Sequence, residues 1–181
     1  MEKFIIAARN VGADVQVISN LEELVAYIDE RIEGGLLLSP CPSLKRAGLS
    51  AMLKTAGVDV VEEDFRAHGA SAAAGLTGAN FGIAATGTVV LESTDEAVRI
   101  ATTLPEKHFV LLDPRKILAT ADEAVPLLGD FHKQMPQAYL AYITGPSRTA
   151  DIERVLTIGV HGPAELHILL LEGLSKDLME R

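Results

Sequence analysis

Short, unbroken apolar runs that alternate with helix-like segments constrain the fold of this chain more than any other feature. Three of these runs contain almost no polar residue: Leu36–Leu38, Phe109–Leu112 and Leu166–Leu171. A strand that is apolar on both faces is typical of a parallel sheet covered by helices on both sides. The sequence therefore predicts an α/β fold with a mostly parallel open sheet, in which these three runs are the central strands.

Helix signals fill the intervals between the apolar runs. Apolar residues recur at helical spacing from Leu21 to Ile32, and Asn20 with Glu23 precedes them in the pattern of a capping box. The same Ser/Thr-x-x-Glu pattern at residues 93–96 and 120–123 predicts the starts of two later helices. The alternation of strands and helices is typical of βαβ units.

The segment Gly69–Ser93 departs from this alternation because it is rich in Gly, Ala and Thr. Two β-prone runs flank a turn at Thr86-Gly87, so an antiparallel β-hairpin is expected as an insertion into the parallel fold. So many small residues let the backbone come close to another structural element or to a ligand, and the sequence leaves both readings open.

The length of 181 residues predicts a single domain over 1–181, because two ordinary domains need a longer chain. A chain of this size buries about 70% of the surface that its unfolded form exposes. With 48% hydrophobic but only 4% aromatic residues, the core is expected to be aliphatic.

A formal net charge of −9 argues against two classes of partner. Nucleic-acid binding depends on neutralising phosphates with Lys and Arg, and an anionic membrane surface makes the same demand. A small anionic ligand responds to the local field of its pocket, so it is not excluded. The first residues lack the features of a secretory signal, no apolar stretch approaches the roughly 20 residues of a membrane helix, and a cytoplasmic location is expected.

Cys41 is the one cysteine of the chain. An intramolecular disulfide is therefore excluded, and a zinc site with several cysteines is excluded too. An iron–sulfur cluster also needs several thiolates. No cofactor and no metal site are expected in this chain, and Cys41 itself is read as an ordinary loop or buried thiol.

The segment 145–153, Gly-Pro-Ser-Arg-Thr-Ala-Asp-Ile-Glu, follows an expected strand and is predicted to open a helix after Thr149. Open α/β sheets bind ligands beyond the carboxyl ends of their strands, and free amides at a helix start favour anions. Ser147, Arg148 and Thr149 are therefore candidate ligands for a small carboxylate or phosphate. Pairing of Arg148 with Asp151 is the structural alternative.

Two further sets of residues are candidates for a site. His161 lies in the turn Val-His-Gly-Pro and is a candidate catalytic base, because the pKa of histidine lies near neutral pH. Thr86, Gly87 and Thr88 offer hydroxyls beside an accessible backbone, and Glu92 downstream is a second catalytic candidate. The plain alternatives are a tight turn fixed by the histidine and a hairpin turn with β-branched neighbours.

Four motifs in order resemble the lactate-utilisation protein C family, whose members carry a LUD domain. They are residues 76–92 (Leu-Thr-Gly-Ala-Asn-Phe-Gly-Ile-Ala-Ala-Thr-Gly-Thr-Val-Val-Leu-Glu), 104–108 (Leu-Pro-x-x-His), 143–153 (Ile-Thr-Gly-Pro-Ser-Arg-Thr-Ala-Asp-Ile-Glu) and 159–167. Each motif alone is weak, but four in sequence are specific. The matching motifs cover about 76–167, and earlier residues fit by pattern only.

The resemblance implies a fold similar to the NagB/RpiA/CoA-transferase-like class and a non-redox role beside iron–sulfur partner proteins that oxidise L-lactate to pyruvate. In that scheme the clusters reside in the partners. Two alternatives stay open: a free-standing enzyme acting on a phosphorylated or CoA-linked metabolite, and an assembly subunit without catalysis. The oligomeric state is open as well, a homo-oligomer included.

The chain departs from the family pattern at two positions in the hairpin. Ala85 stands where the family often has Glu, and Asn80 stands where it often has Asp. Related folds use a glutamate nucleophile for covalent CoA transfer, and alanine cannot supply one. This chemistry is therefore disfavoured for this chain, with Glu92 as a weak substitute.

Overall fold

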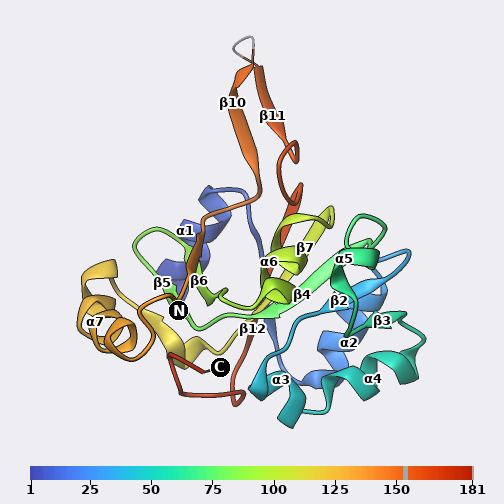
Figure 1. Ribbon diagram of the computed structural model, residues 1–181, viewed down its shortest axis with the longest axis horizontal. Helices are drawn as coiled ribbons and strands as arrows, with labels where there is room; N and C mark the ends of the chain where they lie inside the picture. Colours follow the sequence, from blue (N-terminus) through green and yellow to red (C-terminus); the bar gives the residue numbers. More distant parts are fainter. Residues whose placement is uncertain (153–154, 181) are drawn as a thin grey trace.

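The computed structural model describes residues 1–152 and 155–180, without the side chains of residues 150–152 and 155–156. Within these residues an open six-stranded sheet is parallel throughout, with the strand order β1-β12-β7-β4-β2-β3 (Figure 1). Its strands are β1 (Asp14–Ile18), β2 (Leu36–Leu38), β3 (Val60–Val61), β4 (Ala74–Gly78), β7 (Lys107–Leu112) and β12 (Glu165–Leu171). The three apolar runs are all interior strands, which confirms the prediction.

Helices from the first third of the chain cover one face of this sheet. They are α2 (Leu21–Asp29), α3 (Pro42–Arg46) and α4 (Leu49–Ala56). Leu24, Ile28 and Leu53 from these helices are fully buried against the strands. Gly48, at φ +68°, separates α3 from α4.

The other face is covered by α1 (Glu2–Asn10), α5 (Phe65–His68), α6 (Glu96–Thr103) and a second sheet. This four-stranded sheet has the order β8-β5-β6-β9. Its strands are β5 (Phe81–Ile83), β6 (Thr88–Glu92), β8 (Ile117–Leu118) and β9 (Leu140–Ile143). The pair β5–β6 is the predicted antiparallel hairpin, and β9 extends it antiparallel to β6.

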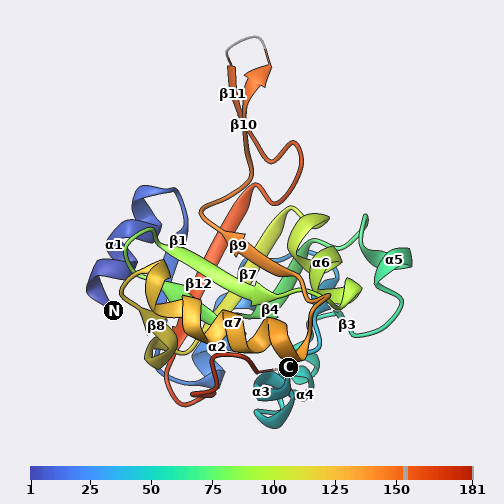
Figure 2. The same cartoon turned by 60° about the vertical axis from the view of Figure 1, so that its left-hand side comes forward.

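The outer face of the small sheet is covered in turn by α7 (Val125–Gln134) and by residues 174–180 (Figure 2). Two short 3-10 helices, η1 (Pro114–Lys116) and η2 (Ala121–Ala124), lead from β7 to α7. Leu178 and Met179 pack against a buried cluster that includes Phe81 and Val90. The end of the described chain is thereby held against the body.

The prediction of a helix after Thr149 is wrong. The chain instead forms β10 (Arg148–Ile152) and β11 (Val155–Ile158), an antiparallel pair that projects from the body in Figure 1. The physical reason lies in composition, because Thr149, Ile152, Val155, Thr157 and Ile158 are β-branched and favour extended backbone.

The other predicted helix starts had mixed outcomes. Asn20 accepts a hydrogen bond from the Glu23 amide at 2.8 Å, so the first cap is confirmed. The cap of α6 is Asp95 and not Ser93, because the Asp95 carboxylate accepts from the Ala97 amide while the Ser93 hydroxyl donates to a carbonyl of the neighbouring strand region. The Thr120 side chain makes no cap bond, and the α-helix begins at Val125. Within the described residues, no helix combines the length and apolarity needed to cross a membrane.

Candidate functional site

Two motifs that are far apart in the sequence meet beside helix α1. The Thr88 hydroxyl lies 2.6 Å from the Thr86 hydroxyl and 2.8 Å from the Thr144 hydroxyl. These contacts follow from the pairing of β6 with β9, in which Val89 faces Ile143. The three hydroxyls are engaged with one another, and Thr86 and Thr144 are exposed.

Glycine is required where both motifs pack on α1. Gly87 has φ +67°, and a Cβ there would lie 2.2 Å from the backbone nitrogen of Ala8. Gly145 has φ +74°, and its Cβ would lie 2.2 Å from the Val11 carbonyl oxygen. Both values favour glycine for conformation and for space. These two glycines therefore serve helix–strand packing, which is one of the two readings that the sequence left open.

Arg148 does not lie at a helix start. Its guanidinium donates to the Val11 carbonyl at the end of α1, and the side chain is exposed. Ser147 and Thr149 are half-buried, and the Ser147 amide donates to the Pro163 carbonyl at 2.9 Å. The helix premise behind this anion site is therefore lost, whereas ligand binding by these three residues stays a prediction. The alternative pairing with Asp151 concerns a side chain outside the described residues.

The two catalytic candidates lie apart from each other. His161 is exposed in the loop that packs against Ser147. Thr88 and Glu92 are the first and last residues of β6. A strand rise of about 3.3 Å per residue separates them by roughly 13 Å. The Glu92 carboxylate accepts from the Thr94 amide at 2.9 Å. The chain thus does not bring His161, Glu92 and the threonines into one constellation.

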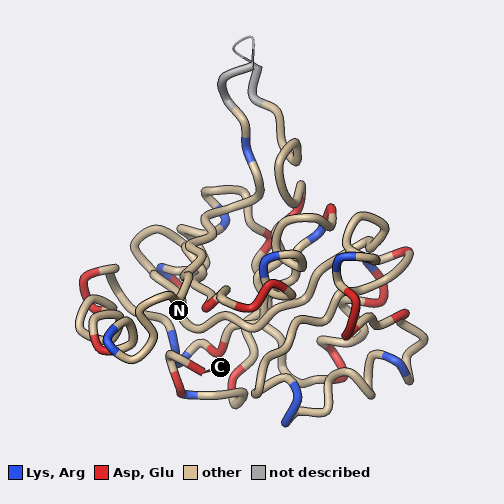
Figure 3. Tube along the Cα trace, in the orientation of Figure 1, with Lys and Arg blue, Asp and Glu red and all other residues tan. Residues whose placement is uncertain are grey.

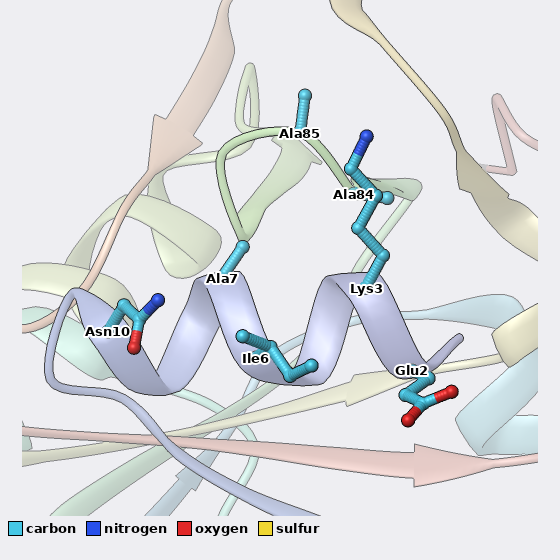
Figure 4. A pocket seen from close by; sticks show the side chains of 7 residues that line it. All are labelled: Glu2, Lys3, Ile6, Ala7, Asn10, Ala84 and Ala85. Carbon is cyan, nitrogen blue, oxygen red and sulfur yellow. The ribbon is translucent and has the colours of Figure 1, made fainter.

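A hollow of about 360 Å³ lies between α1 and the turn after β5. Figure 4 shows Lys3 rising from α1 beside Ala84 and Ala85, with Asn10 further along the helix. Ala85 lines this hollow at the position where the family pattern often has Glu. Ala85 thus presents a methyl group to the hollow that Lys3 also lines.

A larger hollow, of about 550 Å³, lies at the carboxyl edge of the six-stranded sheet. Its lining follows the ends of β1 and β12 and helix α3, with Ser19, Ser43, Arg46 and Glu172 among the lining residues. Ligands of open α/β sheets bind in this position, outside the carboxyl ends of the strands. The sequence also predicted a ligand site after a strand, but in the segment 145–153 that follows β9.

Asp113, directly after β7, organises this edge. Its side chain is fully buried and accepts from Arg115 Nη2 at 2.6 Å and from the amides of Gly173 and Ser175 at 3.0 and 3.3 Å. Although burial by itself raises the pKa of this carboxyl, the hydrogen bonds to Arg115 and to these amides outweigh it and lower the pKa to about 2. Asp113 thereby ties the segment after β12 to the end of β7.

Lys116 lies next to Asp113 with a side chain that is only 4% exposed. Its Nζ donates to the Asp177 carbonyl at 3.1 Å and lies 3.9 Å from Glu180 Oε2. Burial lowers the pKa of this lysine, while the carboxylate of Glu180 opposes the shift. A desolvated ammonium of this kind attracts a carboxylate more strongly than a surface lysine does.

Asn80 and Arg46 complete the surroundings of Glu180. Asn80 Nδ2 donates to the Glu180 carbonyl at 3.0 Å, and its Oδ1 accepts from the Glu92 amide at 2.6 Å. Arg46 Nη2 donates to Glu180 Oε1 at 2.6 Å. Asn80 thus joins β6 to the end of the described chain, in a position where an Asp of the family pattern could not donate. Lys116 and Glu180 were missed because an isolated Lys and Glu in polar segments resemble surface residues.

A different polar cluster lies at the amino edge of the same sheet. His167 Nδ1 is 3.0 Å from the Tyr27 hydroxyl, and its Nε2 is 2.9 Å from Glu165. His108, fully buried nearby, is 2.8 Å from the Thr77 hydroxyl, and burial lowers its pKa to about 3. Both histidines therefore have hydrogen-bond partners within the fold.

Charge is distributed evenly over the body. Figure 3 shows Lys and Arg scattered among Asp and Glu along the described part of the trace. In residues 1–152 and 155–180, no three His, Cys, Asp or Glu side chains are grouped so that they could hold a metal ion.

Comparison with known proteins identifies the family of this chain. The model of the LUD domain matches residues 1–171. An uncharacterized protein of Neisseria meningitidis is 41% identical over 54% of this chain and 42% of its own length. Lactate utilization protein C of Anoxybacillus flavithermus is 31% identical over 82% of this chain and 62% of its own length. The chain therefore spans less than two thirds of these relatives.

A solved structure supports the fold. The crystal structure of a DUF162 family protein from Deinococcus radiodurans superposes with a TM-score of 0.66 and covers 94% of both chains at 22% identity. At this identity the likeness concerns the fold, which agrees with the parallel sheet described above.

Proposed function

Since the chain belongs to the LUD domain family, we propose that it is a non-redox component of an iron–sulfur system that oxidises L-lactate to pyruvate, and that it binds a small carboxylate. Two relatives that are 31% and 30% identical over 82% and 78% of this chain carry the name lactate utilization protein C. Clusters and electron transfer are assigned to partner proteins, because one cysteine cannot ligate a cluster alone.

The observation that carries the carboxylate proposal is the buried ammonium of Lys116 at the carboxyl edge of the sheet. The Glu180 carboxylate lies between it and Arg46, which lines the hollow of about 550 Å³. Arg46 lines the open space at the strand ends, Lys116 is buried behind it, and the hydrogen-bond donors of these two cations match a small carboxylate.

A ligand panel on the full chain tests this proposal. L-lactate and pyruvate are expected to raise the melting temperature, because a ligand of the native state stabilises by RT ln(1 + [L]/Kd), about 2.7 kcal/mol at a hundredfold excess over Kd. Stabilisation by sugar phosphates or CoA, with no response to lactate or pyruvate, would favour a free-standing enzyme that acts on a phosphorylated or CoA-linked metabolite.

An anaerobic pull-down tests the partners separately. The tagged chain is expected to retain cysteine-rich iron–sulfur proteins from a lysate of lactate-grown cells. Retention of these proteins together with a flat ligand panel would favour an assembly subunit without a ligand. Failure to retain them under conditions that preserve clusters would contradict the role in the oxidation system.

A further inference from the structure

The carboxylate of Glu180 occupies the polar end of the carboxyl edge. Its side chain is 7% exposed, and it is held by Arg46 at 2.6 Å through Oε1 and faces the Lys116 ammonium at 3.9 Å through Oε2. Residues 172–180, which supply Glu180, lie beyond the region that the family model matches. The groups that surround this carboxylate therefore come from the matched domain, and the carboxylate itself does not.

The fit of Glu180 in this position is incomplete. In the part of the chain that the structure describes, its Oε2 is the one buried side-chain oxygen or nitrogen without a hydrogen-bond partner. The distance of 3.9 Å to Lys116 is too long for a hydrogen bond. A buried charged group that lacks a partner is unfavourable, so a carboxylate that bonds both oxygens would fit better.

The donors that hold residues 174–180 would suit a free carboxylate. Lys116 Nζ donates to the Asp177 carbonyl and Asn80 Nδ2 donates to the Glu180 carbonyl. If the segment moves away, both donors and Arg46 face the vacated space, next to the hollow that Arg46 lines. Three donors of this kind can satisfy the two oxygens of one carboxylate.

We propose that Arg46, Asn80 and Lys116 form a carboxylate-binding site that Glu180 occupies in cis, and that a small free carboxylate displaces Glu180 and residues 174–180 with it. This inference rests on the proposed carboxylate ligand and adds its regulation. A tethered competitor acts at an effective concentration in the millimolar range, so the site opens only when the ligand is abundant.

Substitution of Glu180 tests the competition. In E180Q the tethered group loses its charge, and L-lactate or pyruvate is expected to bind roughly tenfold more tightly or better by calorimetry, because the charged competitor is gone. Glu96→Gln is the matched control, since it removes the same charge from a 2.6 Å contact with Arg66 on the exposed surface of α6. This control is expected to leave the Kd of the ligand unchanged.

The double variant E180Q/K116M tests the site itself. Replacing both members removes the charge pair and leaves no uncompensated buried charge, so the fold is expected to survive. The gain in affinity seen in E180Q is expected to disappear. Retention of the full gain in the double variant would show that the ligand binds elsewhere and would overturn the proposal.

A measurement on the unaltered chain covers the case in which E180Q does not fold. The amides of Gly173 and Ser175, where the segment begins, donate to the buried Asp113 carboxylate of the body, so they report whether the segment is seated. Saturating L-lactate is expected to accelerate their hydrogen exchange by roughly tenfold or more. Unchanged exchange at saturation would overturn the displacement.

The outcomes separate this inference from the proposed function. Equal Kd values for lactate in the natural chain and in E180Q would keep the carboxylate ligand and refute the competition. Tighter binding of acetate or formate in E180Q, without binding of lactate or pyruvate, would keep the cis-occupied site and refute the lactate role. No response of E180Q to any carboxylate would refute the site.

Discussion

The two ends of strands β7 and β12 carry polar groups in contrasting arrangements. At the amino ends, both ring nitrogens of His167 have partners, Tyr27 and Glu165, which are half-buried and exposed. At the carboxyl ends, Lys116 and Glu180 are almost completely buried, and one oxygen of Glu180 lacks a partner within the described residues. The ring nitrogens of the first network have their hydrogen-bond partners, whereas the second network leaves a buried carboxylate oxygen without one in the described part of the chain.

From this contrast we expect the amino ends of the strands to contribute to stability and the carboxyl ends to contribute to ligand binding as well. Satisfied hydrogen bonds near the surface stabilise a fold modestly and respond little to added ligands. Buried charges that lack full partners destabilise the state that contains them, and a ligand can relieve this. We therefore expect substitutions at the amino ends to change stability alone and substitutions at the carboxyl ends to change binding as well.

The largest effect on stability is expected for Asp113→Asn. Arg115 and the amides of Gly173 and Ser175 lose a buried carboxylate, and removal of one member of a buried ionic cluster costs about 3 kcal/mol or more. Urea unfolding at pH 7 measures the loss. Asp130→Asn, in an exposed pair with Lys133, serves as the control and should change the free energy of unfolding by less than about 0.5 kcal/mol.

The next effect is a dependence on pH that comes from His108. Its pKa in the folded chain is lowered to about 3, while an unfolded histidine titrates near 6.5, so the unfolded chain binds the extra proton between these values. The free energy of unfolding should therefore be unaffected by this group above pH 6.5 and fall by up to about 1.4 kcal/mol per unit below it. In His108→Gln this contribution should disappear. An unchanged slope between pH 6.5 and 4 would contradict the assignment.

A smaller effect is expected at the amino ends from Tyr27→Phe. The hydroxyl contacts His167 at 3.0 Å and Asp14 at 3.2 Å, and a net loss of about 1 kcal/mol is typical of such hydrogen bonds. Tyr142→Phe on β9, where the side chain is 51% exposed, is the control and should be neutral. Lactate binding should stay the same in both variants. A change in the Kd of lactate for Tyr27→Phe would contradict the expectation that substitutions at the amino ends change stability alone.

The smallest effect is expected for Arg148→Ala. The side chain is exposed and contacts one carbonyl at the end of α1, so thermal stability should change by less than about 0.5 kcal/mol. The response to L-lactate should persist if the ligand binds at the carboxyl edge. Loss of this response with an intact fold would instead place the ligand at Ser147, Arg148 and Thr149, as the sequence predicted.

Much of the fold follows from local sequence. The interior strands were predictable because near-continuous apolar runs can only be buried on both faces, and the cap at Asn20 followed from its spacing to Glu23. The projecting pair β10–β11 was not predicted. The apolar spacing around Ile152 and Val155 resembles a helix as well as a hairpin, so periodicity alone does not decide between the two.

The candidate site was less predictable than the fold. The meeting of Thr88 with Thr144 depends on strand pairing that no local pattern reveals, although both motifs were singled out. Lys116 and Glu180 become buried only because segments near residues 41–46, 78–80, 113–116 and 172–180 converge at one edge. Burial of a charge by distant segments leaves no periodic signal in the sequence.

Magnetic resonance of the lysine side chains tests directly whether a small carboxylate binds at the Lys116 ammonium. With lysine labelled at the terminal carbon and nitrogen, and Lys116 assigned through a single substitution, L-lactate is titrated into the chain. We expect a saturable shift of the Lys116 signal that occurs at lower lactate concentration in E180Q. A saturable shift confined to Lys3 or other lysines, with the Lys116 signal unchanged, would contradict carboxylate binding at Lys116.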